Sequence, residues 1–530
     1  MKFKRQRLVS ENSLSRMVVD ADVLWKRREF QKSIEILDRA SQLDPANARI
    51  LLDLGSVYGS RYDYAAAERC FEKAARVALR KTEALAAAGE RCCHFNQYEM
   101  AERFFQRVVE QKDVSLPKAL VKLAEIQERL HRLDAAAGFV ERALHSDPNF
   151  TPALLTKASL ERQAGRLEEA EQTLRSFLSK PNPNLRAMGW YEMSEADTHV
   201  RGWYELGGVL DRLKRYDEAM AAYLEAKALL RPNAARLIAD MQPRYGRINN
   251  MKTGVTAEML QRWFDSGQAL QPPHRLALLG GHPRSGTTLL EQVLDSHPDI
   301  ISAEETTIFR DDACAPFTRR TLTDIYKLAA LGIASDEILQ ESRKHYFQSI
   351  ERFLGQPVGN RLLLDKNPAL TTLIPHLIRV FPEIKFLVAL RDPRDVCWSC
   401  FIQPFRPIGE ITCAYLDLEN TVEEYVVMMD LWRTIAPLMK NPFLEVRYED
   451  MVNDLESVAR RTLDFLGAPW DARVLGFDEH ARKKVVLSPT YADVVKPVYK
   501  GAVGRWRNYQ KYFEPHLEKL EPFIKAFGYE

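Results

Sequence analysis

Small and bulky apolar residues recur along the first half of the chain with a period of about 34 residues. In each period a small residue is followed by a bulky residue four positions later and by an apolar residue seven positions later. Offsets of four and seven place these side chains on one face of a helix. Another small residue, twelve positions earlier, would let a preceding helix approach that face closely. The pattern therefore predicts six helix pairs over about residues 16–232.

The central column of this pattern consists of Ser33, Ala67, Ala101, Ala136, Ala170 and Ala219, with spacings of 34, 34, 35, 34 and 49 residues. The earlier small positions are Ala21, Gly55, Gly89, Ala124, Ala158 and Gly207. The longer last spacing implies about fifteen additional residues near 182–196, and we expect them to form a longer connection.

After residue 232 the pattern changes to alternating strands and helices. The run 276–279 is apolar and ends in two glycines, as expected for a buried parallel strand followed by a turn. The stretch 288–295 has the pattern of an amphipathic helix. Two further apolar runs, 361–364 and 386–390, predict strands. The expected fold class is an all-α repeat superhelix followed by an α/β domain with a P-loop-like parallel sheet.

These patterns predict that the chain has four parts. We expect a polar tail at 1–15, the repeat array at 16–235, a linker at 236–271 and the α/β domain at 272–530. A chain of 530 residues is too long for one ordinary core, which agrees with more than one domain.

The composition argues against nucleic-acid binding, membrane insertion and metal binding. The formal net charge of +2 lacks the basic excess of a general nucleic-acid binder, so we expect no nucleic-acid partner. Apolar runs are strand-sized, which predicts no membrane span, and the N-terminus lacks the apolar run of a secretion signal. Seven cysteines without zinc-binding spacing predict free thiols, no metal and a cytoplasmic location. We interpret the lone CxxC, Cys397 and Cys400, as packing on a helix.

The sequence after the first strand is rich in groups that bind anions. A loop that runs from a strand into a helix N-terminus aims backbone N–H groups at one point. Here Gly286 permits close backbone approach, while Arg284 adds a guanidinium. The hydroxyl donors of the loop are Ser285, Thr287 and Thr288. A nucleoside-triphosphatase loop would carry a lysine before Thr287, and this one does not.

The repeat columns resemble the tetratricopeptide repeat (TPR), and HPRSGTTLL resembles the 5′-phosphosulfate loop of sulfotransferases. These enzymes use 3′-phosphoadenosine 5′-phosphosulfate (PAPS). The resemblance covers about 272–512 and is nearest to the tyrosylprotein branch and to TPR-fused sulfotransferases. It implies that Arg391 and Ser399, in LVALRDPRDVCWS, bind the 3′-phosphate. It further implies nucleotide contacts from Tyr448, Lys496, Arg505 and Trp506.

The same resemblance implies the catalytic residues. The segment Glu304-Glu305-Thr306 resembles the catalytic segment of tyrosylprotein sulfotransferases, whose second glutamate is the base, so Glu305 is the expected general base and Glu304 a charged neighbour. Lys366 would steady the bridging oxygen of the leaving group, with help from Ser285 and Arg284. A histidine base, as in most smaller cytosolic sulfotransferases, is the alternative, and the chain offers His282 and His297.

The expected function is PAPS-dependent sulfuryl transfer to a hydroxyl or amine acceptor, with the TPR array recruiting a peptide or protein. Two alternatives stay open: a TPR scaffold with a non-catalytic nucleotide-binding domain, and a nucleotide kinase or triphosphatase. The missing loop lysine argues against the second. The identity of the acceptor does not follow from the sequence, although the loops 314–323 and 403–415 are expected to build its pocket.

Overall fold

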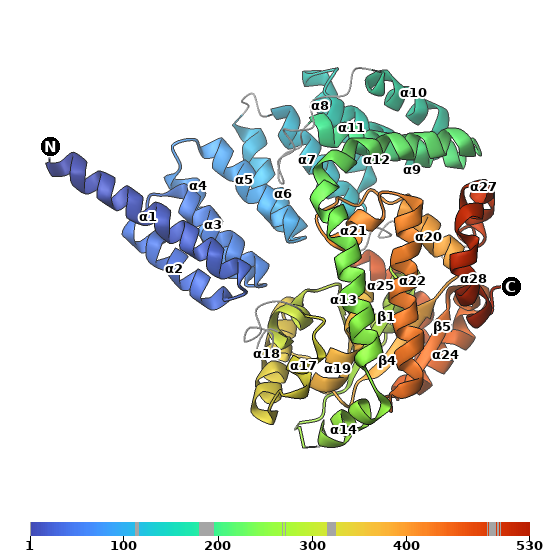
Figure 1. Ribbon diagram of the computed structural model, residues 1–530. Coiled ribbons are helices and arrows are strands. Elements are labelled where there is room, and N and C mark those ends of the chain that lie inside the picture. Colours follow the sequence, from blue (N-terminus) through green and yellow to red (C-terminus); the bar gives the residue numbers. More distant parts are fainter. Residues whose placement is uncertain are drawn as a thin grey trace. The chain divides into compact units, whose positions relative to one another are not determined.

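The computed structural model describes residues 2–111, 116–179, 195–267, 269–270, 272–314, 325–484, 486, 494–495, 498 and 500–530 (Figure 1). Contacts divide the chain into two compact units. One consists of Met1–Thr156 with Phe347–Gln356, and the other of Lys157–Tyr346 with Pro357–Glu530.

The predicted helix pairs are confirmed. The twelve helices of this part are α1 (Lys2–Lys26), α2 (Phe30–Leu43), α3 (Ala48–Ser60), α4 (Tyr64–Val77), α5 (Lys81–His94), α6 (Tyr98–Glu110), α7 (Leu116–Arg129), α8 (Leu133–Ser146), α9 (Thr151–Gln163), α10 (Leu167–Leu178), α11 (Glu195–Arg212) and α12 (Tyr216–Ala239). Consecutive helices pack as pairs, for example α3 on α4 and α11 on α12. The longer connection that we expected near 182–196 falls almost entirely outside the described residues.

The small residues in the first helix of a pair leave space for bulky side chains of the second helix. A Cβ atom at Gly55 would lie 2.4 Å from the ring of Phe71, which is fully buried. In the last pair, a Cβ at Gly207 would lie 2.5 Å from the ring of Tyr223. Both distances are far below van der Waals contact. The close helix approach predicted from the column of small residues is therefore real.

A further periodic position lies in the turn between the helices of each pair. At this position the backbone φ is positive, a conformation that costs energy for residues other than glycine. The residues are Arg28, Tyr62, Asn96, His131, Gly165 and Lys214, with φ between 56° and 80°. Each lies five residues before the central column, so the turn geometry repeats with the helices although the residue type does not.

The glycine column gives a stability prediction with a matched control. We expect Gly55→Ala to destabilise the protein by about 1–2 kcal/mol, because the new methyl group must displace the buried Phe71 ring. Gly138→Ala, in α8, meets no atom within 4 Å and should stabilise by up to about 1 kcal/mol through helix propensity. Urea denaturation followed by circular dichroism measures both. Equal changes in the two variants would contradict the packing argument.

A five-stranded parallel sheet with the order β2-β3-β1-β4-β5 forms the centre of the α/β part. The strands are β1 (Leu276–Gly281), β2 (Ile300–Glu304), β3 (Leu362–Lys366), β4 (Lys385–Leu390) and β5 (Phe443–Arg447). The three predicted strands correspond to β1, β3 and β4. The edge strand β5 was not predicted, because it carries Glu445 and the exposed Phe443 instead of a continuous apolar run.

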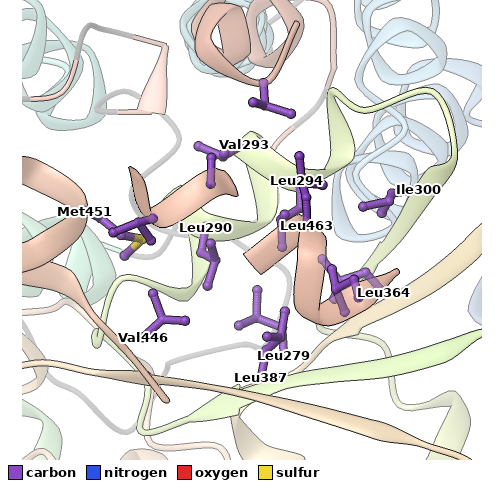
Figure 2. Packing of buried hydrophobic residues seen from close by; sticks show 14 of the residues in the cluster. Leu279, Leu290, Val293, Leu294, Ile300, Leu364, Leu387, Val446, Met451 and Leu463 are labelled. Carbon is purple, nitrogen blue, oxygen red and sulfur yellow. The ribbon is translucent and has the colours of Figure 1, made fainter. Parts of the chain in front are cut away.

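A hydrophobic core on one face of the sheet fixes the position of the loop that follows β1 (Figure 2). Leu279 of β1 and Leu364 of β3 pack with Leu290 and Leu294 of α15 (Thr287–Asp295). Leu463 of α24 (Leu455–Leu466) completes this layer. Because α15 is fixed on the sheet by these contacts, the loop that precedes it is fixed as well.

Residues 236–271, which we expected to form a linker, are mostly helical. The helix α12 continues to Ala239, and α13 (Met241–Gly254) and α14 (Ala257–Gly267) follow it. The side chains of Tyr245 and Ile248 in α13 are buried. Arg244 forms a buried bidentate ion pair with Glu424 of α22 (Leu418–Ile435), at 2.6 and 2.9 Å. Figure 1 shows α13 alongside α22.

Candidate active site

The residues of the candidate site follow the carboxyl ends of the strands, which in a parallel sheet meet at one edge. The strands β1 to β5 lead respectively into the loop 282–286, Glu305, Asn367, Arg391 and Tyr448. Lys366 is the last residue of β3. Segments more than 160 residues apart in the sequence are brought together in this way.

Two glycines of the loop between β1 and α15 are required by close packing. Gly281 has a φ of 111°, and a Cβ there would lie 2.3 Å from the carbonyl oxygen of Ala389. Gly286 has a φ of 92°, and a Cβ there would lie 2.6 Å from the Tyr448 ring. We expected from the sequence that Gly286 lets a ligand approach the backbone closely. The absence of a side chain at Gly286 also makes room for the Tyr448 ring.

The two predicted arginines lie next to each other. The Nε atom of Arg284 donates a hydrogen bond to the Ser399 hydroxyl at 3.1 Å, and Arg391 donates to the carbonyl oxygen of Arg284 at 3.2 Å. The Arg391 guanidinium lies 4.9 Å from the centre of the Tyr448 ring and also donates to the carbonyl oxygen of Ala502. Two guanidinium groups and a hydroxyl from two separate segments thus face one place.

A cavity of about 310 Å³ lies at this place. The predicted residues that line it are Arg284, Gly286, Thr287, Thr288, Glu305, Arg391, Ser399, Tyr448 and Arg505. Within the described part of the chain, Ser285, Lys366 and Trp506 are not among its lining residues. Burial explains the first two, since Ser285 is 2% exposed and Lys366 is 0% exposed.

Trp506, which was expected to contact the nucleotide, is held by its main chain and by its ring. Its backbone N–H donates to Asp395 at 2.9 Å, and the backbone N–H of Gly504 donates to the same carboxylate at 2.6 Å. Its indole ring packs instead against the guanidinium of Arg394, 4.2 Å from the ring centre. Burial raises the pKa of Asp395, and the nearby Arg391 opposes that change. These hydrogen bonds fix the backbone of residues 504–506 to Asp395.

The other nucleotide contacts expected from residues 494–509 were Arg505 and Lys496. Arg505 lines the cavity, while its guanidinium donates to Asp211 of α11 at 2.5 Å. Lys496 lies outside the described residues, as does most of the loop 314–323.

Glu305 and Lys366 form an ion pair at the edge of the cavity. The Lys366 ammonium lies 2.7 Å from Oε1 of Glu305, 3.0 Å from Oε1 of Glu304 and 3.7 Å from Oε2 of Glu291. The Glu305 side chain is 42% exposed, and its φ of 50° turns it toward the cavity end of β2. Burial opposes the charge of Lys366, but the carboxylates of Glu305, Glu304 and Glu291 together raise its pKa above the ordinary value.

A buried layer behind this pair was missed in the sequence analysis. Glu291 of α15 accepts a hydrogen bond from the Ser302 hydroxyl at 2.6 Å, and the Lys484 ammonium lies 3.3 Å from the same carboxylate. Lys484 also donates to Asp295 at 3.1 Å. Burial and the charge of Glu304 raise the pKa of Glu291. The only sequence signal was an acidic residue on the apolar face of α15.

The alternative histidine bases are buried away from the cavity lining. His282 is fully buried, its ring contacts the carbonyl oxygen of Pro283 at 2.9 Å, and burial lowers its pKa to about 4. The His297 ring contacts the carbonyl oxygen of Pro469 at 2.8 Å. Cys400 is buried as well, and burial raises the pKa of its thiol to about 12, as expected for a cysteine that only packs against its neighbours.

The described residues contain neither a metal-binding cluster nor a membrane-spanning helix. They contain no group of three or more His, Cys, Asp or Glu side chains arranged to hold a metal ion. None of the helices in the described ranges is both long and apolar enough to cross a membrane.

Comparison with known proteins gives two family matches. Residues 277–472 match the sulfotransferase family, and residues 20–76, 121–186 and 155–234 match the tetratricopeptide repeat. An uncharacterized protein of Aquifex aeolicus is 26% identical over 342 residues, which are 62% of this chain and 42% of that protein.

Two protein-tyrosine sulfotransferases are also similar. Protein-tyrosine sulfotransferase 1 of Danio rerio is 30% identical over 269 residues, 48% of this chain and 72% of that protein. Its Homo sapiens counterpart is 31% identical over 245 residues, 44% of this chain and 63% of that protein.

Proposed function

The chain belongs to the sulfotransferase family, and we propose that it transfers a sulfuryl group from PAPS to a hydroxyl or amine acceptor. The observation that carries the proposal is that the loop after β1, Arg391, Ser399 and Glu305 all line the same cavity. The volume of about 310 Å³ is within the range of small-molecule sites.

The donor would be held at both of its charged ends. The first N–H groups of α15 lack acceptors within their own helix, as at every helix start, and suit the 5′-phosphosulfate together with Arg284 and the hydroxyls of Thr287 and Thr288. Arg391 and Ser399 suit the 3′-phosphate, because a guanidinium and a hydroxyl together donate several hydrogen bonds to one dianion.

In the proposed transfer step, Glu305 and Lys366 have different roles. Glu305 takes the proton of the acceptor hydroxyl, whose oxygen forms a new bond to sulfur. The bond between sulfur and the bridging oxygen breaks, and its electron pair stays on the phosphate of adenosine 3′,5′-bisphosphate. Lys366 stabilises the developing charge by donating to that bridging oxygen, for which its buried ammonium must turn away from Glu305 toward the cavity. Protonation of Glu305 breaks its ion pair with Lys366 at the moment when the leaving group gains negative charge.

Ligand-dependent thermal stability tests the donor class. We expect adenosine 3′,5′-bisphosphate to stabilise the protein by about 2.7 kcal/mol at one hundred times its Kd, and ATP with magnesium to have no effect. Arg391→Ala should abolish the stabilisation, since it removes one clamp of the 3′-phosphate. Stabilisation by ATP alone would favour a kinase or triphosphatase. Stabilisation by neither ligand would favour a non-catalytic scaffold.

The proposed role of the TPR array is recruitment of a peptide or protein, the general use of such arrays. Incubation of the protein with ³⁵S-labelled PAPS and a native extract, followed by identification of the labelled product, tests acceptor class and recruitment together. A labelled small molecule in place of a labelled protein would contradict recruitment.

A further inference from the structure

Lys227, on the last helix of the repeat array, is buried and lies against the cavity wall. Its side chain is 1% exposed, and its ammonium donates to the carbonyl oxygens of Phe401 at 2.6 Å and Tyr415 at 2.5 Å. It also lies 4.0 Å from the centre of the Phe401 ring. One side chain of α12 therefore joins the two ends of the segment 401–415.

This segment forms a continuous part of the cavity. It runs from the end of α20 (Pro393–Phe401) through α21 (Glu410–Ala414). Its lining residues are Ile402, Gln403, Phe405, Ile411, Thr412 and Tyr415. All of them are uncharged, whereas the lining arginines come from other segments. The wall thus suits a neutral, flat, apolar group, either the adenine ring or a ring of the acceptor.

Burial of a lysine is expensive, so its position needs a reason. A buried ammonium loses its hydration, and the cost is reduced only by good hydrogen bonds. Burial lowers the pKa of Lys227 to about 7, while Asp417 favours its charge. An apolar residue of similar volume would fill the same space at lower cost. What it could not do is hold two main-chain carbonyl groups at a fixed separation.

Two other contacts connect the same helix pair to cavity segments. Asp211 of α11 accepts hydrogen bonds from Arg505 at 2.5 Å and from the Tyr509 hydroxyl at 2.6 Å. Asp197, at the other end of α11, pairs with Arg406 at 2.8 Å. Arg505 lines the cavity, and Arg406 belongs to the segment 401–415.

We propose that the last helix pair of the repeat array, α11 with α12, is a structural part of the catalytic cavity. In this arrangement Lys227 is a positioning residue that fixes the segment 401–415 as the wall for a flat apolar group. The inference rests on the proposed function only in taking the cavity as catalytic. The catalytic unit would then begin before α11, well ahead of the sheet.

Hydrogen exchange of the full-length protein, followed by mass spectrometry, tests the positioning role without any enzyme assay. In Lys227→Met we expect amide exchange in peptides covering 401–416 to become at least tenfold faster, with the exchange of β1 and α15 unchanged. The matched control is Lys252→Met, because Lys252 pairs with Asp430 of α22, outside the segment. Unchanged exchange in a folded Lys227→Met protein would overturn the proposal.

A second variant covers the case in which Lys227→Met does not fold. Asp197→Asn removes the charge that pairs with Arg406, whose side chain is 46% exposed, and we expect a smaller, two- to fivefold acceleration in the same peptides. No acceleration in this folded variant would overturn the proposal when Lys227→Met is unfolded.

Ligand measurements on Lys227→Met identify the group at the wall. A tenfold weaker Kd for adenosine 3′,5′-bisphosphate would assign the wall to the adenine ring. An unchanged Kd with lower transfer of ³⁵S-sulfate into extract would assign it to the acceptor. Faster exchange with both quantities unchanged would overturn the link to the cavity. These Kd and exchange arms remain informative even if the protein transfers no sulfate.

Discussion

Glu305→Gln is expected to lower sulfate transfer by about 10²–10⁴-fold while the Kd for adenosine 3′,5′-bisphosphate changes less than twofold. The amide cannot accept the acceptor proton, but it has nearly the shape of the carboxylate and can keep the unusual backbone conformation. The stability of the protein should change little, because the Glu305 side chain is 42% exposed and Lys366 keeps Glu304 as a partner. Single-turnover transfer from ³⁵S-labelled PAPS and calorimetric titration measure the two quantities.

Glu305→Asp is the matched control for this prediction. It keeps a base but withdraws the carboxylate by one methylene, so we expect it to retain more transfer than Glu305→Gln. A tenfold loss of nucleotide affinity in Glu305→Gln would show that Glu305 supports the binding site instead of acting as the base.

Lys366→Met is expected to abolish transfer and also to lower the free energy of unfolding by roughly 3–5 kcal/mol at pH 8. The first effect follows from the lost stabilisation of the leaving phosphate. The second follows because the substitution removes a fully buried cation from contact with Glu291, Glu304 and Glu305. Urea denaturation and the labelled-donor assay measure the two effects separately.

The loss of stability in Lys366→Met should depend on pH. Burial already raises the pKa of Glu291, and removal of Lys366 takes away a cation that lowers it. A carboxyl group whose pKa is raised in the folded state binds its proton more tightly there than in the unfolded chain. Stability then falls as the pH rises from the unfolded value of about 4.3 to the raised value. The variant should therefore be closer to the wild type at pH 5 than at pH 8.

Lys484→Met separates stability from chemistry. Lys484 contacts the same Glu291 carboxylate and also Asp295, so its loss should lower stability in a similar way. It is absent from the proposed transfer step, and we expect transfer to fall far less than in Lys366→Met. Equal losses of transfer in the two variants would mean that Lys366 acts only through the stability of the fold.

The repeats and the central strands could be predicted because their signals are local. A column such as Gly55 and Gly207 reports one contact repeated along the chain, and an apolar run reports a strand buried on both faces. The edge strand β5 carries Glu445, and α13 lies outside the repeat, so neither produces such a signal. Their positions follow from tertiary contacts, such as that of Arg244 with Glu424, which no short window contains.

The site residues were named from the sequence, but their arrangement was not. The sequence named Arg284 and Arg391 without revealing that one donates to the main chain of the other. It also named Trp506 as a nucleotide contact without revealing that the indole packs against Arg394. Lys227 had no signal, because its two acceptors are backbone carbonyl groups that any sequence supplies.

The site is assembled from the ends of all five strands, which has a consequence for how the protein folds. Until the edge strands have joined, the partly formed sheet would have only fragments of the proposed nucleotide clamp and little affinity for adenosine 3′,5′-bisphosphate. Nucleotide binding would therefore select chains in which the whole sheet is complete, and ligand-protected molecules would unfold as one cooperative unit. Resistance to proteolysis in the presence of adenosine 3′,5′-bisphosphate would then report the integrity of the entire sheet, including strands that never touch the nucleotide.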